Sequence, residues 1–115
     1  QHDDGHTQIL ASTVPNVRAY DPAYAYEMAV IILDGMRKLY EEGGTAIYYL
    51  MAGNENYLHP AMPEGIEEGI VRGMYKLQTR EVAGAKAKVN LFGSGAILRH
   101  VLLAQELLAE RYKVG

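Results

Sequence analysis

The residues best suited to acid–base chemistry stand at the start of the chain, in Gln1-His2-Asp3-Asp4-Gly5-His6. Histidine is the side chain that takes up and releases protons most readily near neutral pH. His2 and His6 flank an Asp-Asp-Gly turn, and loops held by a rigid scaffold commonly carry catalytic groups. The loop is interpreted either as a site of acid–base catalysis or as two exposed histidines. A metal site of His2, Asp4 and His6 fits by ligand type, but the sequence offers no evident fourth ligand.

A second polar cluster, Asn54-Glu55-Asn56-Tyr57 with His59, follows the apolar run at 46–51. In α/β folds, ligands bind just beyond the carboxyl ends of strands. The cluster therefore indicates either a ligand site or a loop whose side chains satisfy buried backbone groups. Sequence alone leaves both interpretations open.

A third motif, Gly93-Ser94-Gly95, joins a predicted strand to a predicted helix. Free N–H groups at such a junction can bind an anion. The motif lacks the third glycine of a dinucleotide fingerprint and the lysine of a P-loop, so a plain tight turn is the alternative.

The spacing of apolar residues predicts the elements that would position these groups. Strands and helices alternate, with strands at 17–20, 45–51 and 88–92 and helices at 23–40, 64–77 and 96–112. We predict that Asp21-Pro22 starts the first helix and that Gly43-Gly44 ends it. Residues 1–8 read as a loop and 79–87 as a linker. Alternation of this kind predicts an α/β fold with parallel strands.

Glycines at 65, 69 and 73 recur every fourth residue in the second predicted helix. Each costs about 1 kcal/mol of helix propensity relative to alanine. We therefore expect this helix to be only partly regular, with another part of the backbone lying close to it.

Composition narrows the classes of function. The chain has 115 residues, of which 49% are hydrophobic and 22% charged, which is typical of a globular protein. Its net charge of -3 offers no basic field for nucleic acid. It has no cysteine, which excludes disulfides and cysteine-ligated metals, and its apolar runs fall short of the ~20 residues that span a membrane. Because it lacks an initiator methionine and any signal sequence, we expect an internal segment of a longer polypeptide.

Several longer strings are specific. They are Gln1-His2 with Asp4-Gly5-His6, Pro15-Asn16, Tyr20-Asp21-Pro22-Ala23-Tyr24-Ala25-Tyr26-Glu27, Asn54-Glu55-Asn56-Tyr57, Pro60-Ala61-Met62-Pro63-Glu64-Gly65, Glu67-Glu68-Gly69-Ile70, Tyr75-Lys76-Leu77, Gly93-Ser94-Gly95 and Ile97-Leu98-Arg99-His100-Val101. In these strings the chain closely resembles the homodimeric bacterial type of pyruvate dehydrogenase first component. The resemblance covers essentially the whole chain but only a minor part of the family's much longer enzymes.

The resemblance implies a transketolase-like α/β fold. Residues 1–78 would be the end of the middle, pyrimidine-binding domain with its exit segment. Residues 79–87 would be a linker, and residues 88–115 the first strand and helix of the C-terminal domain.

The resemblance also implies an activity. Family members decarboxylate pyruvate on thiamin diphosphate with Mg²⁺ and pass the acetyl group to a lipoyl-bearing dihydrolipoyl acetyltransferase, as homodimers in the bacterial cytoplasm. His2 matches the catalytic histidine of the family's Gln-His element. Its implied role is to donate a hydrogen bond or a proton to the substrate-derived intermediate near the thiazolium. His6, on the same loop, is a second-rank catalytic candidate.

The chain has no Gly-Asp-Gly motif with a downstream asparagine, and the resemblance places the cofactor-activating glutamate upstream. We therefore expect thiamin diphosphate and Mg²⁺ to be bound mainly by residues outside this chain, with no cofactor or metal ligand within it. The segment alone is expected to be inactive. The alternatives are a non-catalytic structural or interaction module and another transketolase-like thiamin enzyme. His59 receives no catalytic role.

Overall fold

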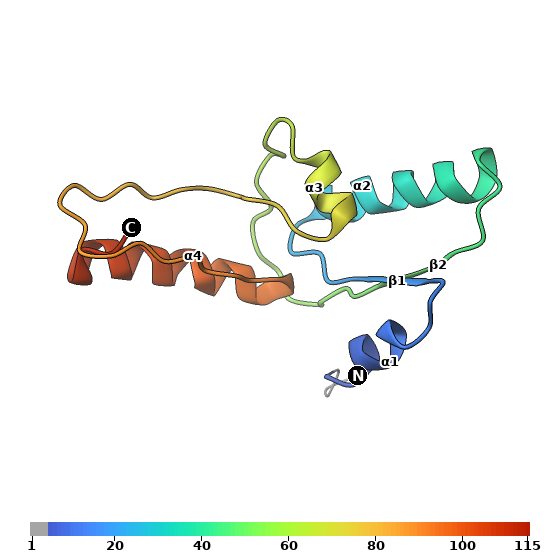
Figure 1. The fold of residues 1–115 in the computed structure, drawn as a ribbon, viewed down its shortest axis with the longest axis horizontal. Coiled ribbons are helices and arrows are strands. Elements are labelled where there is room, and N and C mark those ends of the chain that lie inside the picture. The colour runs from blue at the N-terminus through green and yellow to red at the C-terminus, as the bar shows by residue number, and fades with distance from the viewer. Residues whose placement is uncertain (1–4) are drawn as a thin grey trace.

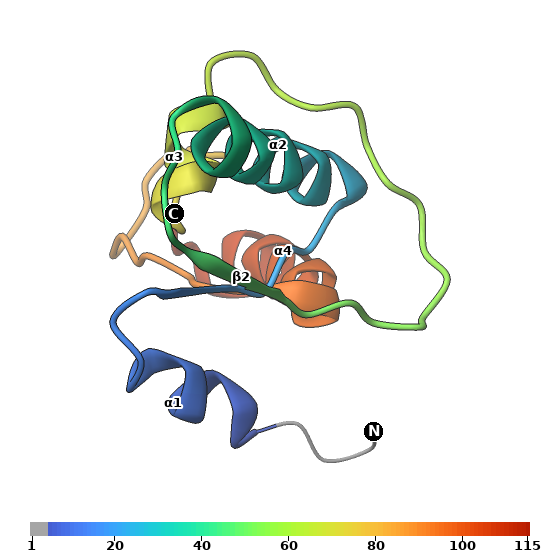
Figure 2. The same cartoon turned by 90° about the vertical axis from the view of Figure 1, so that its right-hand side faces the viewer.

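Two short parallel strands organise the structure, a computed structural model that describes residues 5–115. Strand β1 (Val17–Tyr20) pairs with β2 (Ile47–Leu50), so that Val17 lies opposite Ile47 and Tyr20 opposite Leu50. Two of the three predicted strands and the α/β class are thereby confirmed. The strands lie between helices α2 (Ala25–Met36) and α3 (Glu67–Arg72) on one face and helix α1 (Thr7–Ser12) on the other (Figures 1 and 2).

Helix α2 (Ala25–Met36) is the crossover that two parallel strands require, and it continues into the π-helical turn η1 (Arg37–Glu41). A left-handed Gly43, with φ of 68°, follows the end of this turn, as the sequence predicted. The helix comes close to the sheet at Gly35, where a β-carbon would lie 3.3 Å from the ring of Tyr48. A glycine at this position therefore allows α2 to pack directly on β2.

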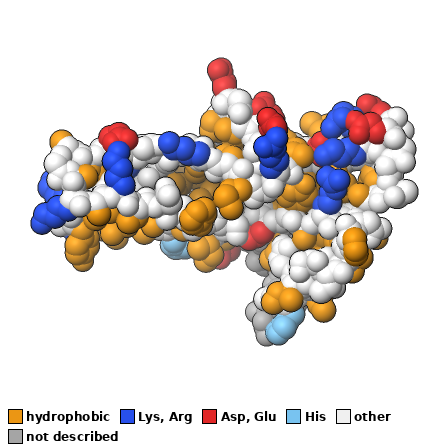
Figure 3. All heavy atoms as spheres, in the orientation of Figure 1, with side chains coloured by type: hydrophobic (Ala, Val, Ile, Leu, Met, Phe, Trp, Pro, Cys, Tyr) orange, Lys and Arg blue, Asp and Glu red, His pale blue; other side chains and the backbone are white. Residues whose placement is uncertain are grey.

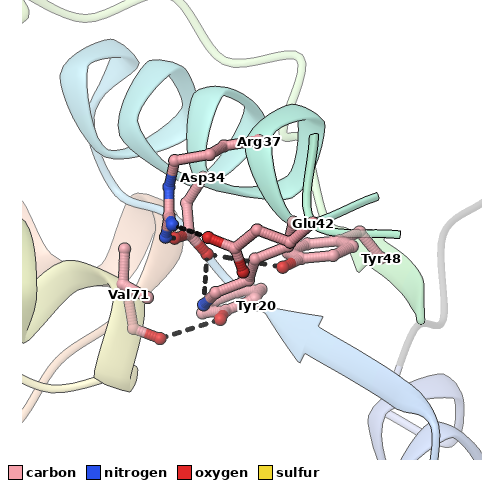
Figure 4. Close-up of polar contacts among 7 residues, drawn as sticks. Tyr20, Asp34, Arg37, Glu42, Tyr48 and Val71 are labelled. Atoms are coloured by element: carbon pink, nitrogen blue, oxygen red, sulfur yellow. Dashed lines mark hydrogen bonds and ion pairs between the residues drawn. The ribbon is translucent and has the colours of Figure 1, made fainter. Parts of the chain in front are cut away.

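An ion-pair cluster fixes the far end of α2 against the sheet. Asp34 accepts hydrogen bonds from Lys38 Nζ at 2.7 Å and from Arg37 Nη2 at 2.9 Å, and the Tyr48 hydroxyl lies 3.4 Å from the same carboxylate (Figure 4). Burial acts to raise the pKa of Asp34, but the hydrogen bonds from Lys38 and Arg37 outweigh it, so this pKa lies below its usual value. Burial and the nearby Asp34 charge raise the pKa of Tyr48.

Helix α1 (Thr7–Ser12) differs from the prediction of a loop over residues 1–8, within the part that is described. Its first turn closes through the Leu10 amide, which donates to the carbonyl of His6 at 3.0 Å. The hydroxyls of Ser12 and Thr13 bond back into the last turn. The helix has six residues and buries none of them. It therefore lacks the buried apolar stripe by which a longer helix is predicted from sequence.

Helix α3 (Glu67–Arg72) is shorter than the predicted 64–77 and packs on α2. It ends at Gly73, whose φ of 88° only glycine adopts readily. A β-carbon on Gly69 would lie 2.6 Å from the β-carbon of Tyr75, so the segment after the helix folds back closely onto it. This confirms the expected close approach and the partial regularity of the helix.

The last predicted helix is confirmed, as a 3-10 turn η2 (Gly95–Ile97), helix α4 (Leu98–Leu107) and a π-helical turn η3 (Leu108–Tyr112). The predicted strand at 88–92 is wrong. A single parallel bridge forms just before this segment, between Ala87 and Val114, and the Val89 amide donates to the carbonyl of Gly115. A strand needs a partner along its length, and the described residues provide none for 90–92.

The buried core of the described chain is small. It consists of Ala23, Tyr24, Ile31, Ile70 and Ala109, together with the carboxylate-bearing Glu27. Many large hydrophobic side chains instead reach the surface, and Figure 3 shows several over the α4 half. Within residues 5–115, no helix has the length and apolar character needed to cross a membrane.

Candidate active site at the carboxyl edge of the sheet

The carboxyl ends of both strands point towards the start of α4 (Figure 1). Tyr20 ends β1 and is followed by Asp21, and Leu50 ends β2 and is followed by Met51. This edge of a parallel sheet is where α/β folds usually bind ligands. Several side chains gather at this edge.

Helix α1 reaches this edge through Gln8. The side-chain amide nitrogen of Gln8 lies 2.7 Å from the sulfur of Met51. His6, the residue before α1, is exposed to solvent. The catalytic candidate His2 lies outside the described residues, as do Asp3 and Asp4. Of the described residues at the start of the chain, Gln8 contacts the residue that follows β2.

A hollow of about 990 Å³ opens next to the same edge. Gln8, Asp21 and Ser94 contribute polar groups to its wall, while Ile31 and Leu98 contribute apolar surface. Its volume is in the range of small-molecule pockets, and a few convergent polar groups in an apolar wall are typical of such sites.

The Gly-Ser-Gly turn closes one side of the hollow. The Ser94 hydroxyl donates to the Asp21 carboxylate at 2.6 Å, and the Gly95 amide donates to the Asp21 carbonyl at 3.1 Å. We call this pair of contacts the Asp21–Ser94 clasp. Gly95 has φ of 50°, and a β-carbon there would lie 2.7 Å from the Asp21 carboxylate. The turn is thus a tight junction filled by Asp21, which leaves no room for an anion in the described arrangement.

The prediction that Asp21 starts helix α2 is therefore wrong. The N-cap residue is Tyr24, and Glu27 supplies the capping carboxylate by reaching back to the amides of Ala23 at 2.5 Å and Tyr24 at 3.4 Å. Asp21 contacts the turn before α4 instead. A glutamate three residues after the N-cap is the second half of a capping box, and this signal could have located the helix start.

Glu27 also organises a buried network that the sequence did not reveal. Its carboxylate accepts a hydrogen bond from the Tyr75 hydroxyl, which lies 2.9 Å from the hydroxyl of Tyr26. Burial, reinforced by the hydrogen bond to Glu27, raises the pKa of Tyr75 far above its ordinary value, and burial also raises the pKa of Tyr26. Both phenols therefore stay neutral. The network ties residues 73–78 to the start of α2.

The polar cluster at 54–59, after β2, makes most of its contacts with other parts of the same chain. Tyr57 donates to the Ala23 carbonyl at 2.5 Å, and His59 Nδ1 accepts from the Ala25 amide at 3.0 Å. Glu55 forms an ion pair with Arg99 at the start of α4. These contacts favour the interpretation of the segment as a structural loop that joins the starts of α2 and α4.

No group of three or more His, Asp or Glu side chains within residues 5–115 is arranged to hold a metal ion. The possible metal site of His2, Asp4 and His6 lies mainly outside residues 5–115, because only His6 is described. His100 is exposed on α4 and takes no part in the carboxyl edge.

Comparison with known proteins adds the family. Residues 1–60 match the family model described as pyruvate dehydrogenase E1 component middle domain. Across 100% of its length, the chain is 57% identical to the pyruvate dehydrogenase E1 component of Escherichia coli K12 and 52% identical to that of Pseudomonas aeruginosa. Identity to the Cupriavidus necator protein of the same name is 43% over 99% of the chain. The chain spans about 13% of the length of each of these relatives.

Proposed function

Because the chain belongs to the family of the pyruvate dehydrogenase E1 component middle domain, we propose that it works as a segment of a thiamin-diphosphate-dependent pyruvate dehydrogenase. In this proposal the complete polypeptide decarboxylates pyruvate oxidatively and passes the acetyl group to a lipoyl-bearing dihydrolipoyl acetyltransferase. It acts as a homodimer in the bacterial cytoplasm. The observation that carries the proposal is the family match over residues 1–60, which includes the histidine loop.

Within this function, His2 is assigned the catalytic role and His6 the second rank. An imidazole N–H can donate to an oxygen of the substrate on which negative charge develops, and can transfer a proton to it. The position of α1 supports this assignment, since Gln8 beside Met51 brings the start of the helix to the carboxyl edge of the sheet. Asp21 and Ser94 fix the opposite side of that edge.

The cofactor is assigned to other parts of the complete enzyme. The chain has no Gly-Asp-Gly motif with a downstream asparagine, so thiamin diphosphate and Mg²⁺ would be held mainly by residues outside this chain. When bound, thiamin diphosphate supplies the electron sink for decarboxylation. We propose that residues 1–78 complete the middle domain, that 79–87 form a linker, and that residues 88–115 begin the C-terminal domain.

Turnover by the complete polypeptide tests the proposal. The enzyme, loaded with thiamin diphosphate and Mg²⁺, should consume pyruvate and acetylate a purified lipoyl domain. Longer 2-oxo acids and sugar phosphates serve as competing substrates under the same conditions. Turnover of one of those without turnover of pyruvate would contradict the proposal and favour another transketolase-like enzyme. Absence of turnover on every substrate would favour a non-catalytic module.

A further inference from the structure

Gln8 is a part-buried side chain at the carboxyl edge of the sheet whose hydrogen-bonding groups are largely unused. It stands in the first turn of α1, and its amide nitrogen donates to the sulfur of Met51 at 2.7 Å. A thioether sulfur is only a weak acceptor. Within residues 5–115 the carboxamide has no other hydrogen-bond partner. Its carbonyl oxygen and its second N–H are therefore available to a ligand.

The Gln8 side chain forms part of the wall of the hollow of about 990 Å³ beside this edge. Asp21, at the end of β1, and Ser94, before α4, lie in the same wall, and Leu98 and Val101 add apolar surface from α4. A few polar groups in a largely apolar wall fix the orientation of a small ligand. Gln8 thus combines access to the hollow with free hydrogen-bonding groups.

The charged groups of the hollow leave donors rather than acceptors available. Its wall contains the carboxylates of Asp21 and Glu27 and the ammonium group of Lys76. Asp21 already accepts from Ser94, and Glu27 already accepts from three donors. These hydrogen bonds compensate the negative charge of both carboxylates. The free amide of Gln8 and the cation of Lys76 therefore suit a small anion with oxygen acceptors.

A carboxylate is the ligand group that the Gln8 amide fits best. Hydrogen bonds to a charged oxygen are shorter and stronger than those to a neutral acceptor. Exchange of the Met51 sulfur for a carboxylate oxygen therefore replaces a weak contact by a strong one. The substrate of the proposed reaction, a 2-oxo acid, carries such a carboxylate next to its keto group.

We propose that Gln8 is a substrate-binding residue: its side-chain N–H donates to the carboxylate of the 2-oxo acid and fixes the orientation of the substrate in the hollow. The inference rests on the proposed function. It assigns binding and not proton transfer to Gln8, because a carboxamide does not titrate near neutral pH. Since the same contact is made before and during the reaction, its loss raises KM and leaves kcat nearly unchanged.

Steady-state kinetics of the complete polypeptide, loaded with thiamin diphosphate and Mg²⁺, test the assignment. Gln8→Leu removes the hydrogen-bonding groups and keeps a side chain of similar size. The KM for pyruvate should rise about tenfold or more, the loss expected for one hydrogen bond to a charged group, while kcat stays within about twofold of wild type. Gln8→Glu places a negative charge beside the substrate carboxylate, so it should raise KM further.

Met51→Leu separates substrate binding from support of the fold. It removes the sulfur partner of Gln8 and leaves the carboxamide in place, and Met51 itself does not line the hollow. The KM of this variant should equal that of wild type. If Gln8 only anchors α1 to the sheet, Gln8→Leu and Met51→Leu should change the kinetics alike, and that result would overturn the proposal.

Two further outcomes keep the role of Gln8 apart from the proposed function. Pyruvate turnover by the wild type together with an unchanged KM in Gln8→Leu would overturn the role of Gln8 alone. A wild-type enzyme that turns over no 2-oxo acid would contradict the proposed function and this inference with it.

Discussion

A single carboxylate, that of Glu27, joins three parts of the described chain. It caps α2 through the Ala23 and Tyr24 amides and accepts from Tyr75, which follows α3. A buried charge is tolerated only when hydrogen bonds compensate it, and three donors supply this compensation. Removal of one donor should therefore destabilise both the start of α2 and the segment around Tyr75.

Tyr75→Phe tests the network at its outer end. The substitution keeps the ring and removes the hydroxyl, leaving the Glu27 carboxylate and the Tyr26 hydroxyl each without one partner. A missing partner of a buried charged group costs about 1–3 kcal/mol. Faster hydrogen exchange is expected at 73–78 and at the start of α2. The matched control is Tyr40→Phe, because Tyr40 is 83% exposed. Equal effects of the two variants would contradict the network.

The pH dependence of the α2 end follows from Asp34. Because the pKa of this carboxyl is lowered in the folded state, the carboxylate stabilises the fold above its unfolded pKa, and this stabilisation is lost as the pH falls through the folded pKa. Asp34→Asn should weaken local protection near residues 34–44 by up to about 1 kcal/mol at neutral pH. The difference from wild type should shrink as the pH is lowered from about 6 towards about 3. Exposed Glu106→Gln is the control; a difference for Asp34→Asn that stays constant with pH would refute the assignment.

At the level of elements, the Asp21–Ser94 clasp joins the end of β1 to the start of α4. The two residues are 73 positions apart in the chain, yet their side chains bond directly. The clasp depends on Gly95, which combines a left-handed backbone with the absence of a β-carbon. The junction is therefore sensitive to a single added methyl group.

Gly95→Ala should loosen the contact between β1 and α4. Its β-carbon would meet the Asp21 carboxylate at 2.7 Å, in addition to the strain of a positive φ. Gly84→Ala is the matched control, because Gly84 has φ of 69° but open space around its Cα. Backbone strain of this kind costs about 1–2 kcal/mol in both variants. Hydrogen exchange at 20–23 and 93–98 should rise only in Gly95→Ala. A similar rise in Gly84→Ala would contradict the claim that the Asp21–Ser94 clasp holds this junction.

The sequence predicted the elements whose signals are local. Both strands, helices α2 and α4 and the break at Gly43 follow from apolar spacing and glycine chemistry. Features that depend on distant partners were missed. Asp21 is an example, because its carboxylate could cap a helix start or bond to a turn far along the chain, and the local pattern does not distinguish the two. The Glu27–Tyr75 contact was hidden for the same reason, since its partners are 48 positions apart. The predicted strand at 88–92 failed because pairing requires a neighbour that periodicity does not supply.

At the scale of the whole molecule, the described chain buries few hydrophobic side chains and exposes many large ones. Leu58, Phe92 and Ile97 are 95%, 72% and 63% exposed, and hydrophobic side chains come to the surface over the α4 half (Figure 3). Apolar surface of this extent is typical of faces that pack against other protein. It agrees with a segment that spans about 13% of its relatives.

The isolated 115-residue chain should therefore lack the function of the complete enzyme. We expect no saturable binding of thiamin diphosphate with Mg²⁺ by titration calorimetry, because the chain has no Gly-Asp-Gly motif with a downstream asparagine. We also expect no turnover of pyruvate. The complete polypeptide, measured in parallel, is the positive control. Saturable binding by the isolated chain would show that this segment carries the cofactor site.

The most direct test of the central claim is turnover by the complete polypeptide carrying His2→Ala. If His2 acts on the substrate, pyruvate turnover with the lipoyl acceptor should fall by about 100-fold or more. Thiamin diphosphate affinity and hydrogen exchange across the fold should stay at wild-type values, and His100→Gln should retain full turnover. Unchanged turnover in His2→Ala, with the cofactor bound and the fold intact, would contradict the account.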